Sequence, residues 1–328
     1  MKLRCRLPMV AAIAAVFIGF STAASSADYP SKPIKIVVPY PPGGGADDFV
    51  RFLAPRLSDR LKQPVVIENR TGATGMIGTT SVARATPDGY TIGLGHADTM
   101  SINPHVFKNI AYDVKTDLVP IAVFGVRPFV LVVSNSVPVN GLADFLKLTH
   151  TQPGKYTFAS PGIGSSAQIA MEMLLQASGG KMQHIPYQGA APAAAAVLGS
   201  QVDSMMSSLA VMQPNHKAGK LKILGITSSQ RLVAAAPDIA TLTEQGLPLS
   251  IVDWYGFVAP AKMPPDVLAT LNREFNTLLG DAEVRNYLTT KTGLQLLEAQ
   301  SPAELRVYLD KMYLQWGKTI ADAKIQVE

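Results

Sequence analysis

The stretch Lys35–Arg51 constrains the fold of this chain more than any other segment. Ile34–Val38 is apolar and β-branched, which predicts a strand, and the prolines after it end that strand. Glycines follow at 43–45, and apolar residues then recur at helical spacing. A strand that turns through glycines into a helix presents free backbone amides and the positive end of a helix dipole. The stretch therefore predicts a carboxylate or phosphate site, or else an ordinary strand–helix connection capped by Asp47 or Asp48.

A second segment repeats this arrangement. Tyr156–Phe158 is predicted as a strand, and Ser160–Ser166 as a glycine-containing turn. The helix after that turn starts with two serine hydroxyls. Further along, Pro186–Gly189 leads into an alanine-rich helix, Ala190–Leu198. The chain therefore carries a second candidate site for an anion.

Strands alternate with helices along most of the chain. This alternation predicts α/β architecture, with mostly parallel sheets and helices on both faces. In such sheets, ligands bind beyond the carboxyl ends of the strands. The loop 95–99 follows a predicted strand, Tyr90–Leu94, so His96 and Asp98 are candidates for a binding cleft. The alternative for this loop is a surface turn with a helix cap.

The length of the chain indicates two domains that share a cleft. The first crossing between domains is predicted at Arg127-Pro128, and the return at 254–260. We therefore expect domain one to comprise residues 28–127 and 253–328, and domain two residues 128–252.

The first 27 residues have the pattern of a signal peptide. Three basic residues precede an apolar run, Met9–Phe20, and small residues follow it. Cleavage is expected before Asp28. The only cysteine, Cys5, would leave with the peptide, so the mature chain would have neither thiol nor disulfide. An exported chain without cysteine suits a bacterial periplasm.

The charge balance offers no support for nucleic acid as a partner. The chain has 29 basic and 24 acidic residues. Removing the three basic residues of the leader leaves 26 against 24, a net charge of +2. No basic run occurs elsewhere, so we expect no nucleic-acid binding.

An ordered set of short motifs covers nearly all of the expected mature chain. The motifs are Val38–Gly44 with Asp47 and Arg51, Val66–Arg70, Pro87–Thr91, Ala159–Ser166, Pro186–Gly189, Gly199–Asp203, Lys217–Lys220, Gly256–Pro260 and Trp316–Lys318. In this set the chain resembles the solute-binding proteins of tripartite tricarboxylate transporters, the Bug or TctC family.

The resemblance implies a fold like that of type II periplasmic binding proteins, with two α/β domains joined by crossing strands that close on a ligand like a Venus flytrap. It implies a periplasmic, monomeric binding protein, without cofactor or metal, that captures a small organic carboxylate. The carboxylate could be a mono-, di- or tricarboxylate, aliphatic or aromatic. Delivery would be to the membrane permease subunits of a tripartite tricarboxylate-type transporter.

The resemblance also implies where the ligand is held, namely by backbone amides, hydroxyls and waters of the facing loops. The candidate ligand-binding residues are Tyr40, Pro42, Gly43, Gly44, Asp47, His96, Thr99, Ser160, Gly162, Gly164, Ser165, Ser166, Tyr187, Gly189 and Ser207. The loops 40–50, 160–168 and 186–191 contain no lysine or arginine, so we expect one carboxylate to sit between two helix starts without a charge clamp. A second carboxylate could reach His96 or Arg127.

An exported enzyme is the alternative function. Gly162–Ala167 matches the dinucleotide fingerprint G-x-G-x-x-A, but the acidic residue expected about 20 positions later is missing. A serine hydrolase would need G-x-S-x-G, and Gly164–Gln168 lacks the last glycine. The five histidines are scattered and support neither a triad nor a zinc site. A histidine within hydrogen-bonding reach of Ser165 would favour the hydrolase.

Overall fold

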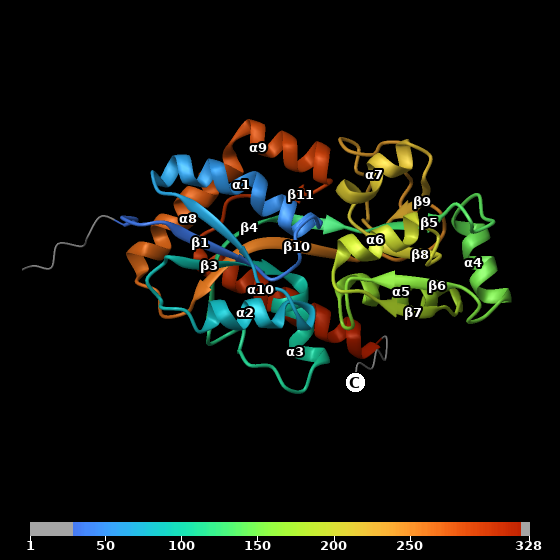
Figure 1. Cartoon of the computed structure of the whole chain (residues 1–328), viewed down its shortest axis with the longest axis horizontal. Helices are drawn as coiled ribbons and strands as arrows, with labels where there is room; N and C mark the ends of the chain where they lie inside the picture. Colours follow the sequence, from blue (N-terminus) through green and yellow to red (C-terminus); the bar gives the residue numbers. More distant parts are fainter. Residues whose placement is uncertain (1–28, 323–328) are drawn as a thin grey trace, which may run out of the picture.

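The structure is a computed structural model, and it describes residues 29–322. The predicted signal peptide and its cleavage site lie outside the described residues. Two α/β domains lie side by side, each with one β-sheet covered by helices (Figure 1). This confirms the predicted two-domain α/β fold.

The first domain is built on a six-stranded sheet with the order β11-β4-β10-β3-β1-β2. Its strands are β1 (Ile34–Val38), β2 (Val65–Asn69), β3 (Thr91–His96), β4 (Leu118–Pro128), β10 (Val252–Pro260) and β11 (Gln295–Leu296). Its helices are α1 (Gly45–Leu61), α2 (Met76–Ala83), α3 (Asn103–Val106), α8 (Pro265–Gly280), α9 (Ala282–Tyr287) and α10 (Pro302–Asp322).

The second domain is built on a five-stranded sheet with the order β7-β6-β8-β5-β9. Its strands are β5 (Val130–Ser134), β6 (Thr157–Ser160), β7 (Gln183–Pro186), β8 (Ser204–Ser207) and β9 (Leu221–Ile226). Its helices are α4 (Leu142–Thr151), α5 (Ser166–Ser178), α6 (Ala190–Leu198) and α7 (Leu209–Lys217).

Both sheets are mixed, so the expectation of mostly parallel sheets is corrected. In the first sheet β1 pairs in parallel with β2 and β3, whereas β10 runs antiparallel to both β3 and β4. In the second sheet β5 runs antiparallel to β8 and β9. β10 and β5 lie next to the domain crossings, and the short β11 also pairs antiparallel with β4. The alternation of strands with helices predicts only the parallel βαβ part, because a strand that returns from the other domain can insert in the opposite direction.

The chain passes between the domains where β4 gives way to β5 and returns before β10 (Figure 1). The predicted domain boundaries, at 127/128 and 252/253, remain a prediction. Each domain has an apolar core of its own, and a further core cluster includes buried residues of both domains, such as Ala97 and Phe158. The two domains are therefore packed against each other in this conformation.

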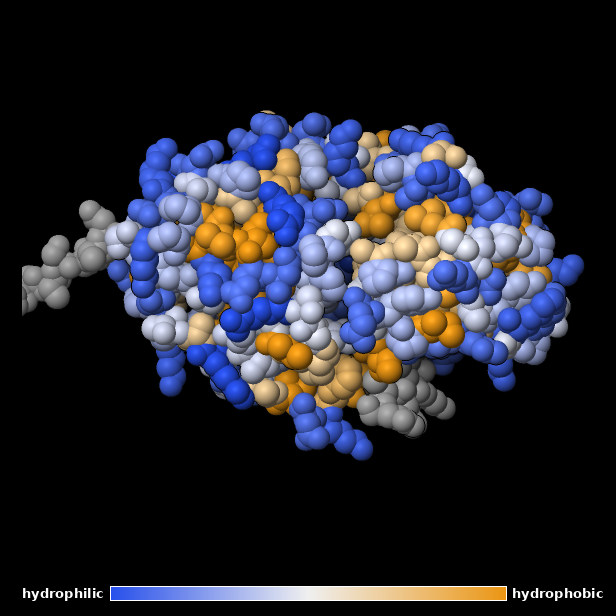
Figure 2. All heavy atoms as spheres, viewed as in Figure 1, coloured by the Kyte–Doolittle hydropathy of each residue, from blue (hydrophilic) through white to orange (hydrophobic). Residues whose placement is uncertain are grey.

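The surface shows no single large apolar face in the view of Figure 2, where orange groups form small, separate patches among hydrophilic ones. Among residues 29–322, no helix combines the length and the apolar character that crossing a membrane would need.

Candidate functional site

A small cavity of about 60 Å³ lies between the two domains. It is found where the parallel strands of both sheets end. In the first domain β1 leads to Tyr40, and β3 ends at His96; in the second, β6 leads to Pro161, and β8 ends at Ser207. The cavity therefore has the position expected for a ligand site in α/β sheets.

Four helices begin at this cavity. The start of α1 contributes Gly44 and Gly45, α5 contributes Ser166, α6 contributes Ala190, and α7 is preceded by Ser208. The first amides of a helix have no acceptor within that helix, and its dipole is positive at this end. Helix starts from opposite domains thus give the cavity a positive potential that suits an anion.

The start of α5 already holds a carboxylate that belongs to the chain itself. The amide of Ser166 donates to Asp98 Oδ1 at 2.9 Å, although Asp98 lies in the other domain. The hydroxyl of Ser165 caps the same helix by accepting from the amide of Gln168 at 3.3 Å. The expectation that a ligand carboxylate sits between two free helix starts is therefore changed. The starts of α1 and α7 remain open to it, whereas that of α5 is partly occupied.

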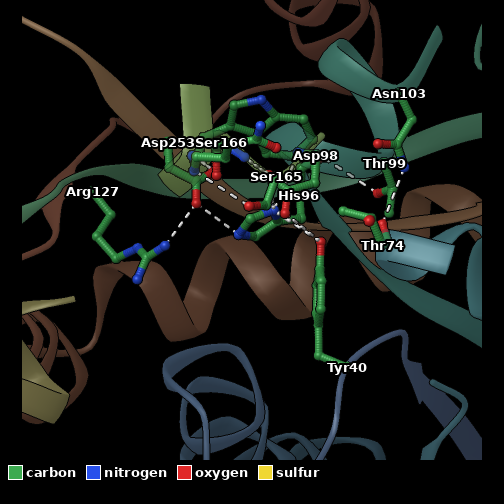
Figure 3. Close-up of polar contacts among 12 residues, drawn as sticks. Tyr40, Thr74, His96, Asp98, Thr99, Asn103, Arg127, Ser165, Ser166 and Asp253 are labelled. Carbon is green, nitrogen blue, oxygen red and sulfur yellow. Dashed lines mark hydrogen bonds and ion pairs between the residues drawn. The ribbon is translucent and has the colours of Figure 1, made fainter. Parts of the chain in front are cut away.

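A cluster of buried charges lies beside the cavity (Figure 3). His96 Nε2 and Arg127 Nη2 each lie 2.7 Å from Asp253 Oδ2. His96 Nδ1 is 3.5 Å from Asp98 Oδ1. When the imidazole is charged, the two cations, His96 and Arg127, balance the carboxylates of Asp98 and Asp253. The cluster is then neutral, so it does not repel an anion in the cavity.

The cluster shifts the titration of its members. Burial alone would lower the pKa of His96, but Asp253 and Asp98 outweigh it and raise this pKa to about 9. Burial would raise the pKa of Asp253, but His96 and Arg127 hold it below its usual value. Burial, followed by the charge of Asp98, raises the pKa of Tyr40 well above its usual value. The raised pKa of His96 favours its cationic form at neutral pH, and the raised pKa of Tyr40 keeps it a neutral phenol.

Tyr40 joins this cluster to the cavity wall. Its hydroxyl lies 3.1 Å from His96 Nδ1 and donates to Asp98 Oδ2 at 3.4 Å. A protonated His96 can therefore donate to Tyr40, which in turn donates to Asp98. The amide of Asp98 also lies 3.2 Å from His96 Nδ1, a contact that only the neutral ring can accept.

The predicted ligand-binding residues divide into three groups. Those that line the cavity are Tyr40, Gly44, His96, Ser166 and Ser207. Those that line an adjoining hollow of about 300 Å³, which also includes Tyr40, are Gly162, Tyr187 and Gly189. Those that line neither are Pro42, Gly43, Asp47, Thr99, Ser160, Gly164 and Ser165. The role of each in ligand binding remains a prediction.

Several of the residues in the last group have structural partners instead. Asp47 is 1% exposed and accepts from the Gly43 amide at 3.0 Å and from Arg51 Nε at 2.7 Å. Asp47 therefore stabilises the glycine turn through hydrogen bonds within the protein. The N-cap of α1 is Gly44, so the predicted cap by Asp47 or Asp48 is wrong. Thr99 is fully buried, and its hydroxyl donates to the carbonyl of His96 at 3.3 Å.

Other residues also line the cavity, among them Arg127, which was expected to reach a second carboxylate. Gly45, Arg127 and Tyr255 line both the 60 Å³ cavity and a third hollow of about 470 Å³ that includes Lys217 and Lys291. Ser208 precedes α7, a helix that was not among the predicted elements. The serine pair before the apolar Leu209 was the available signal for that helix start.

One serine–histidine pair occurs where the sequence did not suggest it. Ser160 Oγ lies 2.7 Å from His184 Nε2, whereas Ser165 serves as a helix cap. Ser160 is fully buried. Burial lowers the pKa of His184 to about 4, and its ring stacks on Phe158. Among the described residues no carboxylate bonds to His184, so this pair lacks both the orienting acid and the access of a hydrolase site. No cluster in residues 29–322 could hold a metal ion.

Comparison with known proteins gives consistent results. The profile of the tripartite tricarboxylate transporter family receptor matches residues 49–324. Protein BugT of Bordetella pertussis is 30% identical over 316 residues, which cover 95% of this chain and 96% of BugT. The structure of the periplasmic binding protein BugD is 32% identical, with a TM-score of 0.86, covering 92% of this chain and all of BugD. The structure of R. palustris Rpa4515 with adipate is 27% identical, with a TM-score of 0.86, covering 91% of this chain and 99% of that one.

Proposed function

This chain belongs to the tripartite tricarboxylate transporter receptor family, and on that basis we propose that it captures a small organic carboxylate in the periplasm. The observation that carries the proposal is the meeting of helix starts from both domains at one cavity. The adipate bound to Rpa4515, a protein with the same fold, supports this class of ligand.

Backbone amides and hydroxyls make the principal contacts to the carboxylate in this proposal. The open amides are at the starts of α1 and α7, and the hydroxyls of Ser207 and Ser208 lie beside them. Hydrogen bonds to a charged partner contribute about 1.5–3 kcal/mol each. Both helices point their positive ends at the same space, so the two contributions act together.

Ligand entry in this proposal involves movement of the domains. The cavity of about 60 Å³ is lined by residues of both domains, and the domains are packed against each other in this conformation. The walls belong to different domains, and an opening between them would both admit the ligand and enlarge the space. The affinity then reflects a closed state that the ligand itself completes.

Delivery to a membrane permease is the remaining part of the proposal, and the family assignment supports it. We expect the permease subunits to bind the closed, ligand-loaded form. Binding assays with reconstituted permease should show tighter binding of the loaded protein, and equal binding of the ligand-free form would contradict this step.

Two measurements test carboxylate capture. In a thermal-shift screen of mono-, di- and tricarboxylates, a true ligand at 100 times its Kd should add about 2.7 kcal/mol to the free energy of unfolding. Calorimetric titration should then compare that acid with its amide, which has nearly the same shape. Recognition by amides and helix dipoles requires the charge, so the uncharged compound should bind far more weakly. Equal binding of the acid and its amide would contradict the proposal.

Export is tested separately. N-terminal sequencing of the protein from the periplasmic fraction should begin at Asp28 if the predicted signal peptide is removed there.

A further inference from the structure

Arg127 uses little of its hydrogen-bonding capacity within the protein. Nη2 donates to Asp253 Oδ2, and Nε is buried without a partner. Within residues 29–322 the guanidinium makes no other hydrogen bond to the chain. A guanidinium has five N–H donors, and burying unpaired donors costs free energy. Arg127 is only 8% exposed, and Nε is the nitrogen of its side chain that is both buried and unpaired.

The single contact with Asp253 does not explain why an arginine is placed here. Asp253 Oδ2 also receives His96 Nε2, and Oδ1 accepts the amide of Trp254 at 2.6 Å. A structural arginine–carboxylate pair commonly uses two parallel N–H···O bonds. Here only one such bond is present, between Nη2 and Asp253 Oδ2. Asp253 therefore holds the guanidinium through Nη2 and leaves its other N–H groups available.

Arg127 lines both the 60 Å³ cavity and the 470 Å³ hollow beyond it. Its guanidinium carbon lies 4.8 Å from the centre of the Tyr255 ring. The start of α1 is near the hydroxyl of the same side chain, because a Cβ on Gly45 would lie 3.4 Å from that oxygen. The helix start and the guanidinium, both positive, therefore lie beside the same tyrosine.

We propose that Arg127 binds a second carboxylate of the ligand and makes the site selective for dicarboxylates. This inference rests on the proposed function and specifies the ligand class. One carboxylate lies at the start of α1, and the other receives the free N–H groups of Arg127. Asp253 and His96 are positioning residues, because they orient the guanidinium without touching the ligand.

The test compares diacids with their monomethyl esters by calorimetric titration. The probes are succinate, glutarate and adipate, each with its monomethyl ester, which keeps one carboxylate and nearly the same length. Wild type should bind at least one diacid more than about 30-fold more tightly than its ester, as expected for charge-assisted bonds to arginine. Arg127→Met should remove that preference and change ester binding by less than about threefold.

Lys291→Met is the matched control. It removes the same charge from the 470 Å³ hollow, but Lys291 does not line the smaller cavity. The control should keep the diacid preference of wild type. If Lys291→Met loses it to the same extent, a general positive field explains the preference, and the proposal for Arg127 is overturned.

A second variant guards against a folding defect. Arg127→Lys keeps the charge beside Asp253 but lacks the planar fork, so the diacid preference should fall while ester binding persists. If wild type prefers no diacid over its ester, or if both arginine variants keep the preference, the inference is wrong. If neither diacids nor esters bind to wild type while other carboxylates also fail, the proposed function itself is wrong.

Discussion

Replacing His96 by glutamine should remove a pH-dependent part of the stability of this protein. His96 is 4% exposed and lies between Asp253, at 2.7 Å from Nε2, and Asp98, at 3.5 Å from Nδ1. The other groups that face it are the phenols of Tyr40 and Tyr255, and Arg127 shares Asp253 with it. The carboxylates raise the pKa of His96 from 6.5 to about 9 on folding.

The sign and the size of this contribution to the free energy of unfolding follow from the linkage between proton binding and folding. A pKa that is higher in the folded state stabilises the fold fully below the unfolded pKa, and this stability is lost as pH rises through the folded pKa. A shift from 6.5 to about 9 corresponds to about 3 kcal/mol, since each pKa unit is about 1.36 kcal/mol. Most of this contribution should disappear between about pH 6 and pH 9.5. The neutral ring can accept the amide of Asp98, which would reduce the loss somewhat.

Urea unfolding at several pH values measures this contribution. The quantity to follow is the unfolding free energy of wild type minus that of His96→Gln, because ionisation of tyrosines in the unfolded chain cancels in the difference. The difference should fall by about 3 kcal/mol from pH 6 to pH 9.5. His150→Gln is the control, since His150 bonds to the carbonyl of Gly179 and to no described carboxylate; it should track wild type. A wild-type minus His96→Gln difference that stays constant with pH would refute the charged state of His96 and the neutral cluster built on it.

Three further predictions concern closure and local stability. Gly45→Ala should weaken carboxylate binding about tenfold in calorimetry, because its new Cβ would lie 3.0 Å from Ser208 Oγ of the other domain. Gly44→Ala is the control. Its Cβ would lie 3.7 Å from the nearest atom, so the affinity should change less than about threefold. Equal effects of the two variants would count against closure at this contact. Ser165→Ala should lower the free energy of unfolding by about 1 kcal/mol in urea titrations, since it removes the cap that accepts from Gln168; an unchanged midpoint would show that the cap contributes nothing. Small-angle scattering should show compaction on addition of a saturating carboxylate ligand, and an unchanged radius of gyration would argue against a hinge motion.

Local patterns in the chain were enough to predict much of the fold. Ile34–Val38 and the helix after the glycines at 43–45 appear as β1 and α1, because β-branched runs and helical periodicity are properties of short segments. The strand–glycine–helix segments also placed Ser166 and Gly44 correctly at a cavity between the domains. Their position follows from the general geometry of α/β sheets and needs no knowledge of distant contacts.

Contacts between distant residues decided the rest. Asp98 occupies the start of α5 from the other domain, and Asp253 holds both His96 and Arg127 although it lies 126 residues from Arg127 in the sequence. The antiparallel insertion of β10 between β3 and β4 brings these groups together. A helix start is open to a ligand only where the fold has not already paired its amides with another polar group, as Asp98 does at α5. That pairing is set by tertiary packing, because a buried donor or charge is satisfied by whatever partner lies near it in space rather than in sequence.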